Sequence, residues 1–142
     1  MSTSFPKSPY DKTHGIVYFA RMCDKIRLHA KGGLPKDYEE NLGKGFDKRC
    51  TDFLQVDYAD ITRLAREGKS DKEIMDWCFA QKFHPTAEQI EVWNGFMTKR
   101  GWKDDGSEIF QRRMKEGGHE ARTDVETMFG YIDLDEGRNS VK

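Results

Sequence analysis

The chain has 142 residues, a length that suits one domain. Charged residues make up 35% of it, yet the two signs nearly cancel to a net charge of −1. This balance disfavours a nucleic-acid binder or a membrane-surface binder, because neither phosphates nor anionic lipids would attract the whole chain. The longest apolar run, Ile16 to Ala20, is too short to cross a bilayer.

Three isolated cysteines indicate a reducing compartment. Cys23, Cys50 and Cys78 form no Cys-x-x-Cys motif and have no neighbouring histidine, which disfavours a zinc site and a disulfide scaffold. The sequence also lacks a phosphate-binding loop, a dinucleotide fingerprint and a Gly-x-Ser-x-Gly nucleophile motif. We therefore expect a cytoplasmic protein with no metal, no cofactor and no catalytic machinery of its own.

The chain begins with an arm and a long helix candidate. Residues 1–13 hold two prolines among polar neighbours, and we expect a flexible arm there. The segment Gly15–Ala30 then has apolar residues at helical spacing. Gly32 can supply its left-handed C-terminal cap, and Pro35 cannot continue it. A short helical turn is expected at residues 36–43.

The middle of the chain predicts two further helices, one after the other. Both have apolar residues at i, i+3 or i+4 and i+7, the spacing of an amphipathic helix. Asp57 is placed to cap the second helix, and Gly68 to end it. The apolar positions are Phe46, Cys50, Phe53 and Leu54 in the first helix, and Tyr58, Ile61, Leu64 and Ala65 in the second.

Three capping boxes predict later helix starts. In each, a Ser or Thr precedes a Glu or Gln by three residues, so that side chains and backbone satisfy each other's hydrogen bonds. The pairs are Ser70 with Glu73, Thr86 with Gln89, and Thr123 with Glu126. Ser107 is expected to cap one more helix. With no strand pattern, we predict an all-α fold, a compact irregular bundle of five to seven helices.

We expect this fold to form one domain. It would span residues 14–138, after the arm at 1–13 and before a short C-terminal tail at 139–142.

The first helix candidate carries charge where a core helix should be apolar. On a helical wheel, Arg27 falls inside the apolar arc, so it needs a carboxylate partner if the helix is central. Arg21 and Lys25 fall on the other side, where Asp24 can pair with Arg21 three residues away. A structural ion-pair network is the favoured interpretation of these four charged residues, and a site for a small anionic ligand is the alternative.

The two ends of the chain carry opposite charge. Residues 1–36 hold seven Lys and Arg against two Asp and Glu, while residues 104–142 hold six against ten. We expect the acidic ending to dock onto the basic first helix. Its candidate ion-pair residues are Asp133, Asp135 and Glu136.

Two further alternatives concern the middle of the chain. Trp93 and Asn94 lie side by side on a helix and are candidates for lining a ligand pocket. Residues 64–74 resemble the entry of a helix-turn-helix, with a glycine-ended helix followed by a Ser-capped one. The helix that would read DNA, however, begins with Glu88 and Glu91, which phosphates would repel.

Four segments together resemble a known family. They are Phe19-Ala-Arg-Met-Cys-Asp-Lys-Ile-Arg27, Gly68-Lys-Ser-Asp-Lys-Glu-Ile-Met-Asp-Trp77, Glu91-Val-Trp-Asn94 and Asp133-Leu-Asp-Glu-Gly-Arg138. Over about residues 8–138, the chain is similar to the uncharacterised bacterial family catalogued as domain of unknown function five-zero-six-nine. The resemblance implies a small intracellular single-domain protein and assigns no activity, cofactor or catalytic residue.

The sequence thus favours a small helical module that binds an anionic small molecule or another protein. An enzyme or a small-anion-binding protein that uses the charged first helix is the alternative. In the enzyme, Arg21 and Lys25 would hold an anionic substrate and Asp24 would act as acid or base. A helix-turn-helix DNA binder is the third reading and the one that the charges favour least.

Overall fold

The computed structural model describes residues 4–138, which form seven α-helices, one 3₁₀ helix and a β-hairpin. The predicted all-α class is confirmed, with the small hairpin as an addition. The elements are β1 (Lys12–Thr13), β2 (Ile16–Val17), α1 (Phe19–Ala30), η1 (Lys36–Asn41), α2 (Phe46–Leu54), α3 (Tyr58–Arg66), α4 (Asp71–Phe79), α5 (Ala87–Lys99), α6 (Ser107–Glu116) and α7 (Met128–Asp135).

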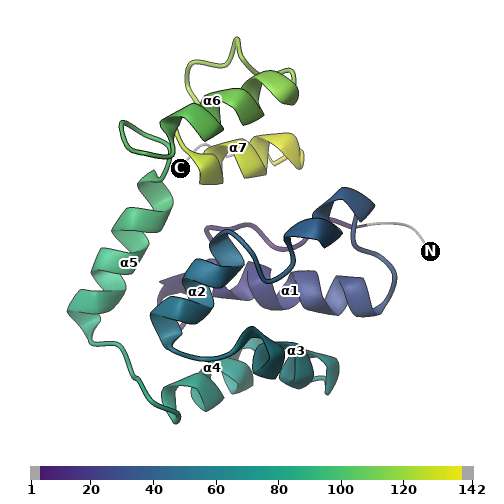
Figure 1. Cartoon of the computed structure of the whole chain (residues 1–142), viewed down its shortest axis with the longest axis vertical. Coiled ribbons are helices and arrows are strands. Elements are labelled where there is room, and N and C mark those ends of the chain that lie inside the picture. Colours follow the sequence, from purple (N-terminus) through teal and green to yellow (C-terminus); the bar gives the residue numbers. More distant parts are fainter. Residues whose placement is uncertain (1–3, 139–142) are drawn as a thin grey trace.

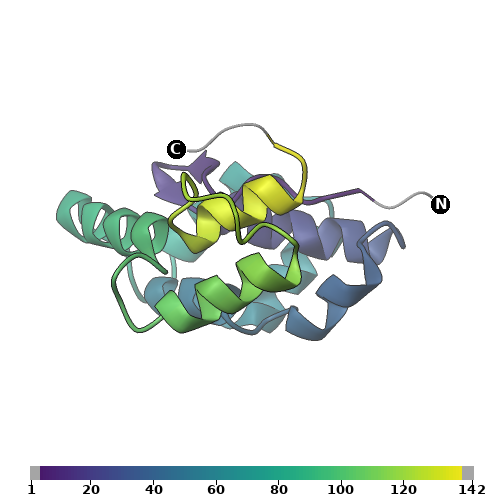
Figure 2. The same ribbon diagram turned by 90° about the horizontal axis from the view of Figure 1, so that it is seen from above.

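Helix α1 lies at the centre of a body formed by α1 to α4 and the hairpin. It packs against α3, α4 and β1, while α5 packs against β2 and α7 (Figure 1). Helix α5 leads from this body to α6 and α7, which lie side by side in both views (Figures 1 and 2). None of the helices within residues 4–138 is both long and apolar enough to cross a membrane.

The apolar core has a main cluster and a satellite. The main cluster joins buried side chains from the hairpin and α1 to α5, and it reaches α7 through Phe129. The satellite lies between α6 and α7, with Phe110, Met114 and Val125 at its centre. Helix α7 therefore connects two packing regions, one on each of its sides.

The start of the first helix differs from the prediction. Residues 15–17 belong to a hairpin in which Lys12 pairs with Val17 and Thr13 with Ile16, so α1 begins only at Phe19. The two-residue turn, His14-Gly15, has φ of 50° and 78°. Tight hairpin turns need positive φ at both central residues, which Gly adopts freely. The sequence analysis missed this turn because His stands where Asn or Asp is usual.

Two of the three predicted capping boxes are confirmed. Ser70 accepts a hydrogen bond from the Glu73 amide at 3.1 Å, and the Glu73 carboxylate accepts one from the Ser70 amide. Thr86 and Gln89 form the same pair of bonds at the start of α5. Both satisfy amides that the first helical turn leaves open.

The other two predicted caps are wrong. Ser107 is already inside α6, and its hydroxyl donates to the Gly101 carbonyl instead of capping the helix. Thr123 lies in a turn, and α7 begins five residues later, at Met128. Its cap is Thr127, whose side chain accepts from the Gly130 amide. Between Thr123 and Thr127, the side chain of Val125 is buried in the satellite cluster, and this segment is not helical.

The segment expected to be an arm packs against the body wherever the structure describes it. Ser8 is only 7% exposed, and the Ser4 amide donates to the Gly33 carbonyl at 2.8 Å. The Tyr18 amide donates to the Pro9 carbonyl at 3.0 Å. Residues 1–3 and the predicted tail at 139–142 lie outside the described residues.

Candidate functional site

The charged side chains of α1 separate onto two faces. Arg21 and Lys25, one turn apart and therefore on the same face, are 5% and 6% exposed. Arg27 retains 22% of its side-chain exposure. The helical wheel placed Arg27 in the apolar arc and the other two outside it, which predicts that Arg27 is the most buried. The structure shows the opposite order. The reason is that the face opposite the apolar arc is also covered.

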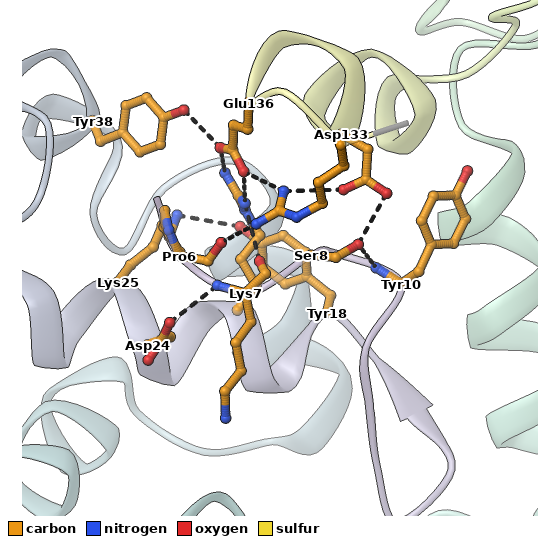
Figure 3. A network of polar contacts seen from close by, with 12 residues as sticks. Pro6, Lys7, Ser8, Tyr10, Tyr18, Asp24, Lys25, Tyr38, Asp133 and Glu136 are labelled. Carbon is orange, nitrogen blue, oxygen red and sulfur yellow. Dashed lines mark hydrogen bonds and ion pairs between the residues drawn. The ribbon is translucent and has the colours of Figure 1, made fainter. Parts of the chain in front are cut away.

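Glu136, at the end of α7, covers Arg21. The Arg21 guanidinium donates to both carboxylate oxygens of Glu136, at 2.9 and 2.7 Å, and to the Lys7 carbonyl at 3.1 Å. Tyr38 from η1 donates its hydroxyl to Glu136 at 2.6 Å (Figure 3). This paired arrangement is the strong geometry of an Arg–carboxylate contact.

The charges of this pair stabilise each other. Burial would lower the pKa of Arg21, but the hydrogen bonds and charge of Glu136 outweigh it and raise that pKa. Burial would likewise raise the pKa of Glu136, but Arg21, Tyr38 and Arg138 lower it. Both groups are thus held ionised.

Arg138 ties the same cluster to the N-terminal segment. It donates to Glu136, to Asp133 at 3.1 Å and to the carbonyl of Pro6. Asp133 also accepts a hydrogen bond from the Ser8 hydroxyl at 3.1 Å (Figure 3). The two ends of the described chain therefore close over α1 through a single polar network.

Lys25 belongs to a second buried group. Its Nζ lies 2.8 Å from Asp47 Oδ1 and donates to the Tyr18 hydroxyl at 3.2 Å. Tyr18 donates to Asp47 Oδ1 at 2.7 Å, and the Gly43 amide donates to Asp47 Oδ2 at 3.0 Å. Asp47 is fully buried, so this carboxylate has no contact with water.

Burial dominates the acid–base properties of this group. It lowers the pKa of Lys25, although Asp47 opposes the shift. Burial and the Asp47 charge raise the pKa of Tyr18 well above its ordinary value. Tyr18 also has φ of 77°, a conformation that costs a bulky residue about 1–3 kcal/mol and that concentrates at functional sites.

Both groups border one cleft of about 500 Å³. One wall of the cleft comes from α1, η1 and α2, and the other comes from α6 and α7. Basic side chains outnumber acidic ones around it. The basic residues are Arg21, Lys25, Lys44, Arg49, Arg100 and Arg113, and the acidic ones are Asp37, Glu40, Asp135 and Glu136.

Two of the cleft's basic residues have no carboxylate within salt-bridge distance among residues 4–138. They are Lys44 and Arg49, and both are exposed. The Arg49 guanidinium lies 5.2 Å from the ring centroid of Phe96, and that of Arg100 lies 5.4 Å from it. Arg100 also contacts Asp104 at 3.5 Å. Lys44 and Arg49 therefore have no internal counter-charge, and neither do the cleft's Asp37 and Glu40 among the same residues.

The remaining α1 candidates, Asp24 and Arg27, lie away from the cleft. Arg27 donates to Asp71 at 2.6 Å, so its predicted carboxylate partner exists on α4. Asp24 accepts from the Lys7 amide at 3.0 Å and lies 3.8 Å from Arg27. The predicted local pair of Asp24 with Arg21 is wrong, because Arg21 turns to Glu136.

Trp93 and Asn94 hold the hairpin instead of bordering the cleft. Asn94 accepts from the Val17 amide at 3.1 Å and donates to the Gly15 carbonyl at 2.7 Å. Trp93 donates its indole N–H to the Val17 carbonyl and stacks on Phe53, with ring centroids 4.7 Å apart. These contacts position β2 just before Tyr18.

The acidic ending docks onto α1 through one of its three predicted residues. Glu136 contacts Arg21, whereas Asp133 contacts Ser8 and Arg138. Asp135 lies 3.1 Å from His119 and is 40% exposed.

Sequence reasoning missed Tyr18, Asp47 and Tyr38. Tyr18 was counted within the first helix, and neither Asp47 nor Tyr38 was among the candidate residues. No local spacing connects these residues, because the fold brings them together from three elements. Burial raises the pKa of the Cys78 thiol to about 12 and those of Cys23 and Cys50 higher still, so no cysteine competes as a nucleophile here.

One family model matches nearly the whole chain. It is described as a domain of unknown function (DUF5069) and matches residues 3–138. The chain therefore belongs to this family, as its resemblance predicted. No curated protein matches it.

Proposed function

We propose that this protein is a binding module whose cleft takes a small anionic molecule. As part of the same proposal we place it in the cytoplasm, since its three cysteines are free thiols that a reducing compartment preserves. Of the alternatives drawn from the sequence, the small-anion site now has the most support. The cations border a cleft instead of a flat face, which suits a small ligand better than a protein surface.

The observation that carries the proposal is that Lys44 and Arg49 border the cleft, are exposed and have no ion-pair partner among residues 4–138. The buried pairs below them, Arg21–Glu136 and Lys25–Asp47, already have internal partners. A ligand anion would therefore bind at the rim, where the guanidinium groups of Arg49 and Arg100 both lie near the Phe96 ring. Guanidinium groups suit this role, because they donate two parallel hydrogen bonds to one phosphate or carboxylate.

The test is calorimetric titration with inorganic pyrophosphate at low salt. We expect binding to the natural protein and a loss of about tenfold or more in Arg49→Ala, the effect of one charge-assisted hydrogen bond. Arg66→Ala is the matched control, since Arg66 is also an exposed helical arginine without an ion pair and lies outside the cleft. Its affinity should stay within about twofold.

Absence of pyrophosphate binding, or equal losses in the two variants, would contradict the proposal. A parallel titration with random duplex DNA addresses the helix-turn-helix alternative. Binding of the duplex that weakens steeply with salt and survives Arg49→Ala would favour that alternative instead.

A further inference from the structure

We propose that Lys25 is a nucleophile that forms an imine with an aldehyde or ketone carried by the anionic ligand. The inference rests on the proposed function, because the same cleft holds the ligand. It adds a covalent step at the cleft floor and names the substrate class, a small carbonyl compound bearing a phosphate or carboxylate.

Within residues 4–138, two polar groups contact the Lys25 nitrogen. Asp47 lies 2.8 Å from Nζ, and the Tyr18 hydroxyl lies 3.2 Å from it. A neutral amine has two N–H groups and one lone pair. With the two N–H groups directed to Asp47 and Tyr18, the lone pair is left without a partner. Lys25 borders the cleft, so this lone pair can meet a ligand there.

The surroundings of Lys25 favour the neutral, reactive form. Burial lowers its pKa, and the positive charge of Arg21 one turn away acts in the same direction, against the pull of Asp47. Lysines that form imines are activated in this way, by desolvation or by a nearby cation. Lys44, at the rim, is exposed.

Tyr18 and Asp47 can move the protons that the reaction requires. Burial keeps the Tyr18 phenol protonated by raising its pKa, and its strained backbone fixes it beside Lys25. Its hydroxyl donates to Asp47, which in turn contacts Lys25. The three groups form a closed relay from amine to carboxylate to phenol.

The chemical step balances through this relay. The Lys25 lone pair forms a C–N bond to the carbonyl carbon, and the carbonyl π electrons move to oxygen. Tyr18 gives that oxygen its proton, Asp47 takes a proton from the nitrogen, and Asp47 returns it to Tyr18. In a second round, Tyr18 protonates the hydroxyl, which leaves as water, while Asp47 takes the remaining proton from the nitrogen and the C=N bond forms. The net change is amine plus carbonyl to imine plus water.

The rim determines which carbonyl compounds fit. A phosphate held by Lys44 and Arg49 leaves the rest of the ligand to extend toward the floor, where Arg21 is already occupied by Glu136. Triose-sized phosphates occupy far less than the cleft's volume of about 500 Å³. Glyceraldehyde 3-phosphate is therefore a suitable probe, and glycerol 3-phosphate is its counterpart without the carbonyl.

The experiment reduces the protein with borohydride in the presence of glyceraldehyde 3-phosphate and maps the adduct by peptide mass spectrometry. We expect modification at Lys25 to exceed that at Lys44 by about tenfold or more, and glycerol 3-phosphate to suppress it. Calorimetry with glycerol 3-phosphate measures binding separately. If it binds but Lys25 gains no preferential adduct, the inference fails and the proposed function stands.

If glycerol 3-phosphate neither binds nor protects, the proposed function fails, and the ligand class named here fails with it. Two variants test the roles. Lys25→Arg should abolish the adduct, because a guanidinium stays protonated, and should keep glycerol 3-phosphate affinity within about threefold, because Lys44 and Arg49 at the rim hold the phosphate. Tyr18→Phe should slow adduct formation about 100-fold without changing that affinity. The peptide map of the natural protein decides the matter even if a variant does not fold.

Discussion

Two buried cations on the same face of α1 meet very different surroundings. The two terminal nitrogens of Arg21 donate to the two carboxylate oxygens of Glu136, and one of them also donates to the Lys7 carbonyl. Lys25, four residues later, has Asp47 and a phenol. Burial acts on both, yet the pKa of Arg21 rises and that of Lys25 falls. Arg21, held ionised by a carboxylate, stabilises the fold, whereas Lys25, whose pKa burial lowers, is the residue that we propose for chemistry.

Removing the partner of Arg21 should have the largest effect. In Glu136→Ala the guanidinium stays buried without a counter-charge, so we expect the free energy of unfolding to fall by about 3–5 kcal/mol. Urea denaturation measures it. Asp135→Ala is the control, because its pair with His119 is 40% exposed and should contribute less than about 1 kcal/mol. Equal losses in the two variants would show that Arg21 does not depend on Glu136.

Acid should weaken the Arg21 cluster selectively. The pKa of Glu136 is lowered below its ordinary 4.5 in the folded protein. Its contribution to stability is therefore complete above about pH 4.5 and is lost as pH falls through the folded-state pKa. Glu136→Gln should be less stable by about 2–3 kcal/mol at neutral pH. Denaturation curves repeated down to about pH 3 should show this gap closing, and a constant gap would refute the ionic explanation.

Removing Lys25 should cost less than removing Glu136. In Lys25→Met, Asp47 keeps hydrogen bonds from Tyr18 and the Gly43 amide, so we expect a loss of about 2 kcal/mol. The same urea series measures it. A loss equal to that of Glu136→Ala would mean that Lys25 is as structural as Arg21, which would remove the contrast drawn above.

The third cation of α1 should matter least. Arg27 and Asp71 are partly exposed, so water already screens their contact. Arg27→Ala should lower the free energy of unfolding by about 1 kcal/mol or less. High salt should weaken this pair first, since exposed pairs are the ones that ions reach. A larger effect of Arg27→Ala than of Lys25→Met would restore the order of burial that the helical wheel suggested.

The sequence predicted what depends on near neighbours. The Ser70 and Thr86 caps involve residues three positions apart, and both are formed. Thr123 had the same spacing without a helix, because the burial of Val125 in the satellite cluster decides the path of the chain there. Local spacing therefore predicts a cap only where tertiary packing agrees with it.

The candidate site was predicted in part for the same reason. Charge asymmetry between the two ends of the chain anticipated the contact of Glu136 with α1. The wheel, however, shows only which residues share a face and nothing of what covers it. Asp47 lies 22 positions after Lys25 on another helix, and Tyr18 reaches both through an unusual φ. The spacing of residues in α1 therefore predicts neither Asp47 nor Tyr18 as a partner of Lys25.

The contact of Arg21 with Glu136 also has a consequence for how the chain is made. The two residues are 115 positions apart, so the ribosome must add that length of chain after Arg21 before its partner exists. Helices α1 to α4 can meet earlier, because their contacts span much shorter stretches of chain. During that interval the second face of α1 stays open and hydrated. The final residues of the described chain then complete a core whose first helix was translated long before them.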